Sequence, residues 1–179
     1  MDIVQKLQLD ANAYLDELTT FLSKNNLTDL VLPPVDHFAY KLQDAPSYEQ
    51  YLEQIAFYAT SVKYIKINER RIATIILKDS ISFKHLGQTS CLEVMEPRPQ
   101  KVGIDFVGLE HIEVLCTNQD ELAKKLIQRN ISYDLFKSPY HEAIVLKINT
   151  KGQEISFTNM PLNDVVALEG KSGKIITIK

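Results

Sequence analysis

Two histidines, His37 and His111, lie in similar short runs nearly half a chain apart, and an acidic residue directly precedes each of them. Around the second, residues 108–115 alternate between polar and apolar side chains, the pattern of a strand with one buried face. Because side chains point alternately to the two faces of a strand, His111 and Glu113 share one face. That face offers an imidazole and a carboxylate, with apolar side chains opposite them.

These residue types are the usual protein ligands of divalent transition metals, which need several nitrogen or oxygen donors at roughly 2.0–2.4 Å. Each half of the chain also ends in a strand-like run with a carboxylate, Glu93 in the first and Glu154 in the second, where Ser156 shares the face of Glu154. A single strand histidine is usually structural, but two at matched positions favour a shared site. Glu93 stands in an apolar run, where a buried carboxylate is costly unless it is paired or ligated; an outward-facing Glu93 is the alternative.

The elements that position these residues repeat in order, which predicts an α+β fold. Each half reads as a strand, a helix and three further strands. The repeat is one of element order, because sequence identity between the halves is poor apart from the acidic residue and histidine in the first strand of each. The helices carry apolar residues at steps of three and four, with expected capping boxes at Ser47/Gln50 and Asn118/Glu121. The expected apolar stripe of the second of them is Leu122, Ala123, Leu126 and Ile127. The expected strands and helices cover residues 35–40, 48–59, 62–68, 72–77, 88–95, 108–115, 118–130, 131–136, 143–149 and 154–158.

Flanking segments complete the expected organisation. Residues 2–25 predict an amphipathic helix whose apolar stripe packs on the main body or, alternatively, forms an oligomer contact. A short helix is expected at 162–169, a late edge strand at 175–178 and a linker at 97–107. We expect an N-terminal extension, residues 1–30, and a single domain, residues 31–179.

The net charge, the cysteine content and the length of the apolar runs disfavour nucleic-acid-binding, disulfide-rich and membrane-spanning proteins. The net charge of −3 over 179 residues disfavours nucleic-acid binding, and the basic residues at 63, 66, 70 and 71 are typical of a charged strand edge. The two cysteines are expected to be buried thiols. No apolar run is long enough to span a bilayer and no secretory signal is visible, so a cytoplasmic location is expected. The chain is expected to be a monomer or a homodimer.

Three runs, at residues 35–37, 107–113 and 152–157, resemble the vicinal oxygen chelate (glyoxalase/bleomycin-resistance/dioxygenase) superfamily and, within it, the YecM-like proteins. The resemblance covers about residues 35–159. It implies two βαβββ modules, at about 35–97 and 108–159, that form a cupped mixed β-sheet, with an extra N-terminal helix and a short C-terminal helix.

The resemblance also implies a divalent metal (Zn, Ni, Mn or Fe) with ligands from four strands. His37 matches the first ligand position, Glu93 the second and His111 the third. Glu96 competes with Glu93 but lies on the opposite strand face. At the fourth position the chain departs from the pattern, because Ser156 stands in the place of the usual carboxylate. Glu154, one same-face step away, is the expected fourth ligand; Ser156 and water are the alternatives.

The activity implied is that of a metal-dependent isomerase, lyase or dioxygenase-like enzyme acting on a small oxygen-bearing substrate. The alternative is a non-catalytic module that binds a small ligand or a protein, and the missing fourth carboxylate weighs against glyoxalase-type proton transfer. Glu113 is expected to orient an imidazole, and Tyr140 and His141 to line the pocket mouth. The metal hypothesis fails if the two imidazoles lie more than about a nanometre apart.

Overall fold

The structure is a computed structural model that describes residues 1–67, 70–97 and 106–171. No helix in these ranges is long and apolar enough to cross a membrane. Along the chain the elements are α1 (Ile3–Lys24), β1 (Val35–Lys41), α2 (Ala45–Ala56), β2 (Ala59–Ile67), β3 (Arg70–Ser82), the 3-10 turn η1 (Lys84–Leu86), β4 (Gln88–Met95), β5 (Gly108–Leu115), α3 (Gln119–Gln128), β6 (Asp134–Lys137), β7 (Glu142–Lys147), β8 (Glu154–Thr158) and α4 (Leu162–Lys171).

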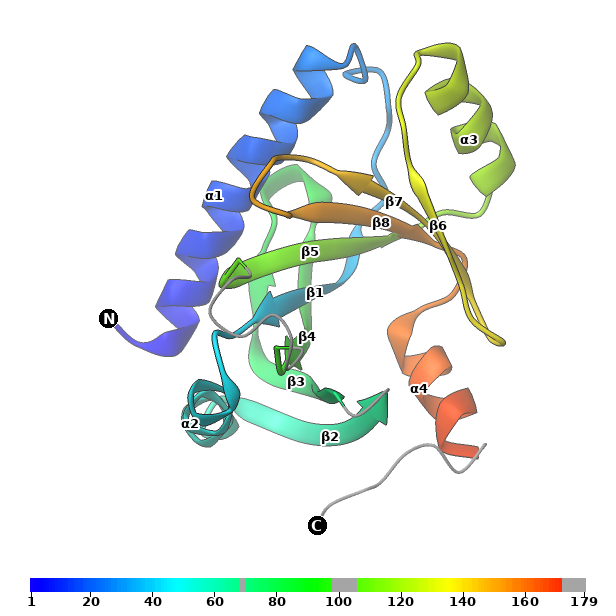
Figure 1. The fold of residues 1–179 in the computed structure, drawn as a ribbon. Helices are drawn as coiled ribbons and strands as arrows, with labels where there is room; N and C mark the ends of the chain where they lie inside the picture. The colour runs from blue at the N-terminus through cyan, green and yellow to red at the C-terminus, as the bar shows by residue number, and fades with distance from the viewer. Residues whose placement is uncertain (68–69, 98–105, 172–179) are drawn as a thin grey trace.

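One mixed sheet with the order β2-β3-β4-β1-β5-β8-β7-β6 runs through the molecule (Figure 1). The first strands of the two halves, β1 and β5, are antiparallel neighbours at its centre. Each pairs in parallel with the last strand of its own half, β1 with β4 and β5 with β8. The predicted α+β class with a mixed sheet is therefore confirmed, and the central four strands are those that carry the candidate ligands.

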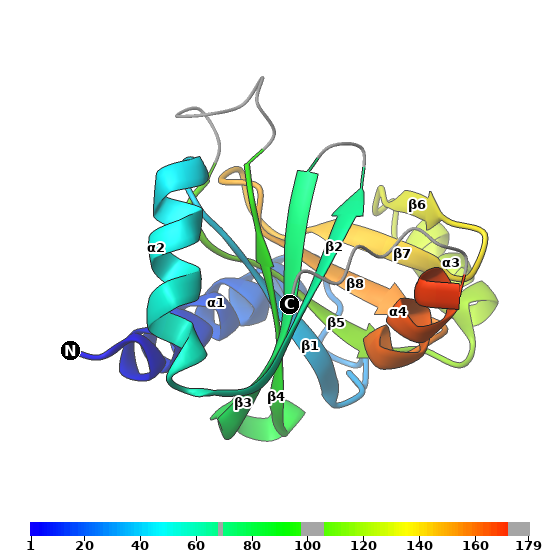
Figure 2. The ribbon, with the colours of Figure 1, turned by 90° about the horizontal axis from the view of Figure 1, so that it is seen from below.

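The two faces of the sheet have different partners. The main core contains the buried apolar residues of α1, α2 and α3 together with one face of the central strands, including Phe38, Ile112 and Ile155. On the other face Cys91 of β4 packs against Leu162 and Val166 of α4. Seen from below, the sheet is strongly twisted, with α1 and α4 well separated (Figure 2). His37, Glu93 and His111 belong to this second face.

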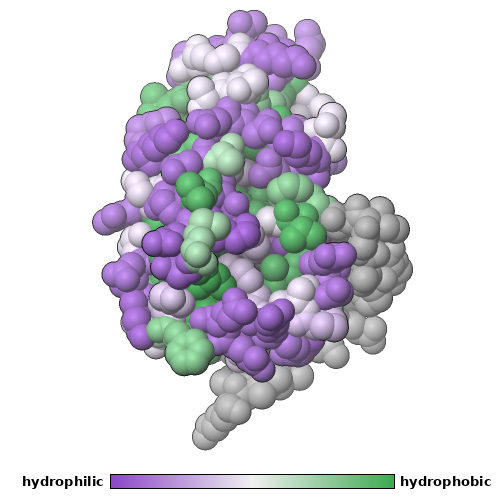
Figure 3. Space-filling model, turned by 90° about the vertical axis from the view of Figure 1, so that its left-hand side faces the viewer, coloured by the Kyte–Doolittle hydropathy of each residue, from purple (hydrophilic) through white to green (hydrophobic). Residues whose placement is uncertain are grey.

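The N-terminal helix packs on the main body, as predicted. Its stripe of Leu7, Ala11, Tyr14, Leu15 and Leu18 is buried in the main core. Its outer side belongs to a largely hydrophilic face with scattered apolar spots (Figure 3). Since α1 shares the core of the sheet, the boundary between residues 1–30 and 31–179 remains an interpretation of the sequence.

Helix ends explain the main departures from the predicted elements. The predicted Ser47/Gln50 capping box is wrong, because α2 begins earlier: Asp44 is its N-cap and Ser47 completes the box as the third helical residue. Pro46 fits this start, since the first helical turn needs no backbone donor there. Asn118 caps α3 as predicted by accepting from the backbone N–H of Glu121. The predicted reciprocal half of the box differs, because the Glu121 carboxylate accepts from the side-chain amide of Asn118.

Two further expectations need correction. Ile127, predicted in the apolar stripe of α3, is 62% exposed, because Leu122 and Leu126 already define the buried side of this short helix. The strand predicted at 131–136 is shorter and later, Asp134–Lys137. Both cysteines are free thiols, Cys91 buried and Cys116 partly buried. Most of the linker at 97–107 and the strand at 175–178 lie outside the described residues.

Candidate metal centre

The antiparallel pairing of β1 with β5 brings the two histidines together. In its register His37 lies opposite Glu113, and His111 lies opposite Ala39, two residues farther along β1. The ring centroids of His37 and His111 are 6.2 Å apart, and the ring planes cross at 78°. The imidazoles are therefore well within the nanometre limit that the metal hypothesis requires.

Each histidine follows a β-bulge that holds one acidic residue. On β1, Asp36 is the extra residue between the pairs Val35–Val114 and His37–Glu113; on β5, Glu110 is the extra residue between the pairs at His111 and Leu109. A bulge turns the extra side chain away from the usual alternation. As a result Asp36 Oδ2 lies 2.9 Å from His37 Nδ1, and Glu110 Oε2 lies 3.7 Å from His111 Nδ1.

The Nε2 atoms of both rings point toward one carboxylate. Glu113 Oε1 lies 3.7 Å from His37 Nε2 and 4.0 Å from His111 Nε2. Ligand atoms of these three residues all lie within 4.8 Å of one another, which makes them a group that could hold a metal ion. The sequence predicts for Glu113 only the role of orienting an imidazole, whereas in the structure its Oε1 lies within 4.0 Å of Nε2 of both rings.

Glu93 also faces this group, from β4 on the other side of β1. It lies opposite Ala39 in the parallel register, is only 9% exposed, and its Oε2 is 3.9 Å from His37 Nε2. The competing residue, Glu96, is engaged elsewhere: both of its carboxylate oxygens accept hydrogen bonds from the guanidinium of Arg71. The geometry thus supports Glu93 over Glu96.

The residues considered for the fourth ligand lie on β8, the other neighbour of β5. Glu154 lies opposite His111 in the parallel register, and Ser156 lies opposite Glu113. Burial raises the pKa of the Glu154 carboxyl, and the nearby His111 opposes this rise. Glu154 therefore lies beside the cluster, and its assignment as a ligand remains a prediction.

Burial lowers the pKa values of the two histidines, and the surrounding carboxylates raise them. Burial disfavours the charged His37 ring, but Glu113, Asp36 and Glu93 together outweigh it and raise the pKa of His37 to about 9. For His111, burial is likewise overcome, chiefly by Glu110, and the pKa is raised. Without a metal, both rings are thus biased toward the protonated form.

The carboxylates respond differently according to their partners. Burial raises the pKa of Glu93, although both histidines oppose the rise. Burial also acts on Glu110, but His111 and the ammonium of Lys41, 2.9 Å away, lower its pKa to about 2. Against burial, the hydrogen bonds from His37 and from the backbone N–H of Leu162 lower the pKa of Asp36. The two bulged acids are therefore the firmly ionised ones.

One buried atom in the described part of this cluster makes no hydrogen bond. Within the described part of the chain, His37 Nε2 is fully buried and makes no hydrogen bond. Buried polar atoms are nearly always paired, so such an atom needs an explanation. Donors bound tetrahedrally at about 2.1 Å from zinc lie roughly 3.4 Å apart. The 3.7 and 4.0 Å spacings to Glu113 are close enough for small side-chain rotations to reach this geometry, so the donor set fits an ion.

Apolar side chains flank the cluster on both sides. Ala39, Ile65, Ile72 and Met95 form one group, and Cys91 with Leu162 and Val166 of α4 forms the other. Between them, Thr74 lies opposite Glu93 in the β3–β4 register, and its hydroxyl is a second buried atom that makes no hydrogen bond within the described residues. Apolar flanks lower the local dielectric and strengthen electrostatic interactions.

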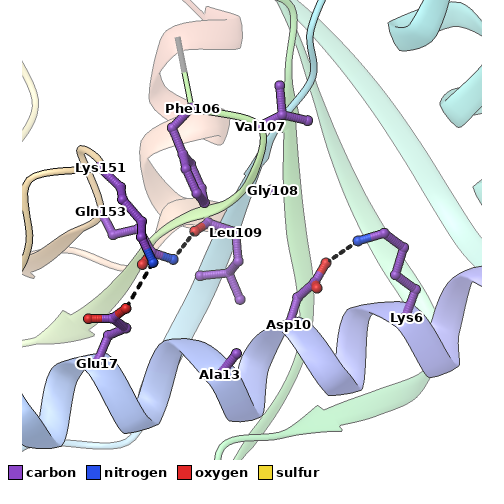
Figure 4. Close-up of a pocket in the computed structure, with 10 residues that line it drawn as sticks. All are labelled: Lys6, Asp10, Ala13, Glu17, Phe106, Val107, Gly108, Leu109, Lys151 and Gln153. Carbon is purple, nitrogen blue, oxygen red and sulfur yellow. Dashed lines mark hydrogen bonds and ion pairs between the residues drawn. The ribbon is translucent and has the colours of Figure 1, made fainter.

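Two other features lie apart from this cluster. His141, predicted near a pocket mouth, is held at the β6–β7 turn by Ser138 Oγ, 2.9 Å from its Nδ1, and by the ring of Phe136; its role, like that of Tyr140, remains a prediction. A pocket of about 270 Å³ lies between α1 and the start of β5, with the ion pairs Lys6–Asp10 and Glu17–Lys151 at its ends (Figure 4).

Comparison with known proteins gives a family and a fold. Residues 4–177 match the family model described as YecM protein. A solved structure from structural genomics, protein EC4020, superposes with a TM-score of 0.72 at 20% identity and covers 92% of each chain. A methylmalonyl-CoA epimerase of Streptomyces coelicolor, in complex with 2-nitronate-propionyl-CoA, has a TM-score of 0.46 at 18% identity, covering 72% of this chain and 97% of its own. No curated protein matches this chain significantly.

Proposed function

Because the match spans residues 4–177, the chain belongs to the YecM protein family, and from this premise we propose that it binds a divalent metal ion between β1 and β5. The proposed ligands are His37, His111 and Glu113, with Glu93 completing the set. Through this ion the protein would bind a small oxygen-bearing molecule. The observation that carries the proposal is the buried Nε2 of His37, which makes no hydrogen bond within the described residues and points at a carboxylate that the second imidazole also faces.

Charge balance supports a divalent ion. Four carboxylates (Asp36, Glu93, Glu110 and Glu113) surround the two imidazoles and Lys41. With both rings protonated, the imidazolium and Lys41 charges nearly balance these carboxylates. Metal ligation requires neutral imidazole, so each ring must release a proton. One divalent cation carries the same charge as the two protons that the rings release, so the cluster keeps its overall charge.

The nitrogen and oxygen donors of the proposed ligands favour a divalent transition metal. Imidazole nitrogens and carboxylate oxygens suit Zn²⁺, Ni²⁺, Mn²⁺ and Fe²⁺. A bound ion would supply Lewis acidity toward a ligand with two neighbouring oxygens. The chain's own residues would exclude water with the two apolar groups and offer the Thr74 hydroxyl as a hydrogen-bond partner. Glu93, whose pKa burial raises, would have to release its proton before its carboxylate completes the ligand set.

Glu113 and Glu154 compete for the position beside His111. Glu113 lies within 4.0 Å of both imidazoles, and Glu154 lies opposite His111 on the neighbouring strand. We therefore propose Glu113 as the ligand and Glu154 as the residue that replaces it if Glu113 rotates away. Comparing the metal affinities of Glu113→Gln and Glu154→Gln distinguishes these roles, because only the ligand's variant should lose most of its affinity.

A non-catalytic ligand-binding protein is the second candidate function. It is favoured by Ser156, which is buried opposite Glu113 at the place where the superfamily pattern has a carboxylate. Such a protein would bind metal and a small molecule with no proton acceptor at this position. Isotope exchange at acidic C–H groups of candidate ligands distinguishes a metal-dependent enzyme that moves protons from a non-catalytic binding protein, because only the enzyme would promote the exchange.

The proposal is tested by metal analysis of purified protein together with thermal unfolding. Binding to the folded state alone stabilises it by about 2.7 kcal/mol when the metal concentration is 100 times the Kd. We expect this stabilisation in the wild type and in His85→Ala, an exposed-histidine control. We expect it to be absent in His37→Ala and His111→Ala. A wild type that retains no metal and gains no stability with any of the four ions would overturn the proposal.

A further inference from the structure

The two bulged acids, Asp36 and Glu110, occupy equivalent places around the candidate centre. Each is the extra residue of a β-bulge and directly precedes a histidine, and each approaches that histidine at Nδ1, on the side away from Glu113. A bulge is an unusual way to place a side chain, and bulges are over-represented beside functional sites. Two of them, one on each strand of a single pair, indicate that the placement serves the histidines.

Each acid is itself fixed by a second contact. Asp36 Oδ2 also accepts a hydrogen bond from the backbone N–H of Leu162, 3.1 Å away at the start of α4. The Glu110 carboxylate accepts a hydrogen bond from Lys41 Nζ at 2.9 Å. Both carboxylates are therefore held by contacts independent of the imidazoles, so each offers a fixed acceptor to a ring nitrogen.

An ionised carboxylate only accepts hydrogen bonds, so Nδ1 of His37 must carry the hydrogen in its 2.9 Å contact with Asp36. Glu110, 3.7 Å from His111 Nδ1, electrostatically favours the hydrogen on the same atom of that ring. Once each ring has released the proton that metal binding displaces, its remaining nitrogen, Nε2, faces Glu113 with a lone pair available. Carboxylates that fix the tautomer and orientation of a metal-binding histidine in this way also raise its basicity.

Resting on the metal site proposed above, we propose that Asp36 and Glu110 are positioning residues that set both imidazoles for metal binding through Nε2. They do not touch the ion themselves. Through Leu162, the Asp36 contact also ties the start of the C-terminal helix α4 to the orientation of His37.

The test uses Co²⁺ as the probe, because its visible absorption reports coordination geometry, with Zn²⁺ competition for affinity. In Asp36→Asn and Glu110→Gln we expect a 10- to 100-fold loss of Zn²⁺ affinity and a changed Co²⁺ spectrum. The conservative Asp36→Glu and Glu110→Asp variants should recover part of both. Glu53→Gln, which removes an exposed carboxylate on α2, should match the wild type.

A measurement on the unaltered protein protects the test against variants that fail to fold. In the Zn²⁺-loaded wild type, long-range ¹H–¹⁵N correlation spectra should show Nδ1 protonated and Nε2 metal-bound in both His37 and His111. Metal bound through Nδ1 in either ring, or wild-type affinity and spectrum in folded Asp36→Asn and Glu110→Gln, would overturn this inference. A wild type that binds no metal would instead overturn the proposed function.

Discussion

Metal affinity should rise steeply with pH, because protons compete for the imidazoles. The carboxylates around His37 raise its pKa to about 9, and Glu110 raises that of His111. A metal takes the neutral ring, so a protonated ring must first lose its proton. The experiment therefore measures Zn²⁺ affinity between pH 6.5 and 8.5, with a chelator that fixes the free Zn²⁺ concentration.

The magnitude follows from the position of the His37 pKa. At pH 7, two units below a pKa of about 9, roughly 1% of this ring is neutral, which lowers the apparent affinity about 100-fold relative to the neutral ring. Each unit of pH up to about 9 should therefore strengthen binding about 10-fold, or about 1.4 kcal/mol, through His37 alone. Release of a second proton from His111 would make the slope steeper, up to about 100-fold per unit.

Isothermal titration in buffers of different ionisation enthalpy measures the slope and the protons released. We expect between one and two protons per bound ion at pH 7. A chelator of known protonation, titrated in the same buffers, controls for the behaviour of the metal. An affinity that stays constant between pH 7 and 8.5, with no proton released, would refute the assignment of these imidazoles as ligands.

Three further predictions concern the stability of the metal-free protein, which is measured by urea unfolding; the second adds a measurement of Zn²⁺ affinity. Because its folded pKa is raised, His37 stabilises the fold fully below about pH 6.5, and this contribution of about 3 kcal/mol is lost as pH rises through about 9; the stability difference from His37→Asn should shrink accordingly, and a constant difference would contradict it. Tyr14→Phe should cost about 1 kcal/mol, because it removes the hydrogen bond from α1 to the Glu154 carbonyl, while Zn²⁺ affinity stays the same; a loss of affinity would show that α1 reaches the site. Asp44→Ala should cost about 1 kcal/mol and Gln50→Ala much less, whereas the reverse order would restore the capping box expected from the sequence.

Much of the fold could be predicted because local patterns and long-range packing agree in this chain. The alternation in β5 and β8 marks strands whose ends coincide with the prediction, as does the end of β4 at Met95. The apolar stripe of α1 is buried as its period indicates. Prediction was weakest where polar residues compete for a cap, as at Asp44 and Ser47, since both can accept from a helix N-terminus.

The site could be predicted only in part, for a physical reason. Alternation places His111 and Glu113 on one face and gives no information on which strands become neighbours. The antiparallel β1–β5 pairing decides that Glu113 lies opposite His37. The roles of Asp36 and Glu110 depend on bulges, which interrupt alternation and so cannot be read from it. The acidic residue that directly precedes each histidine is the clue to these roles that the sequence offers.

The most direct test of the metal centre is X-ray absorption spectroscopy at the Zn edge of Zn²⁺-loaded wild-type protein. We predict two imidazole nitrogens and carboxylate oxygens at about 2.0–2.2 Å, with no sulfur ligand. Loss of one imidazole contribution is expected in each of His37→Ala and His111→Ala if these variants retain any metal. A sulfur ligand at about 2.3 Å, or a spectrum with fewer than two imidazoles in the wild type, would contradict the account.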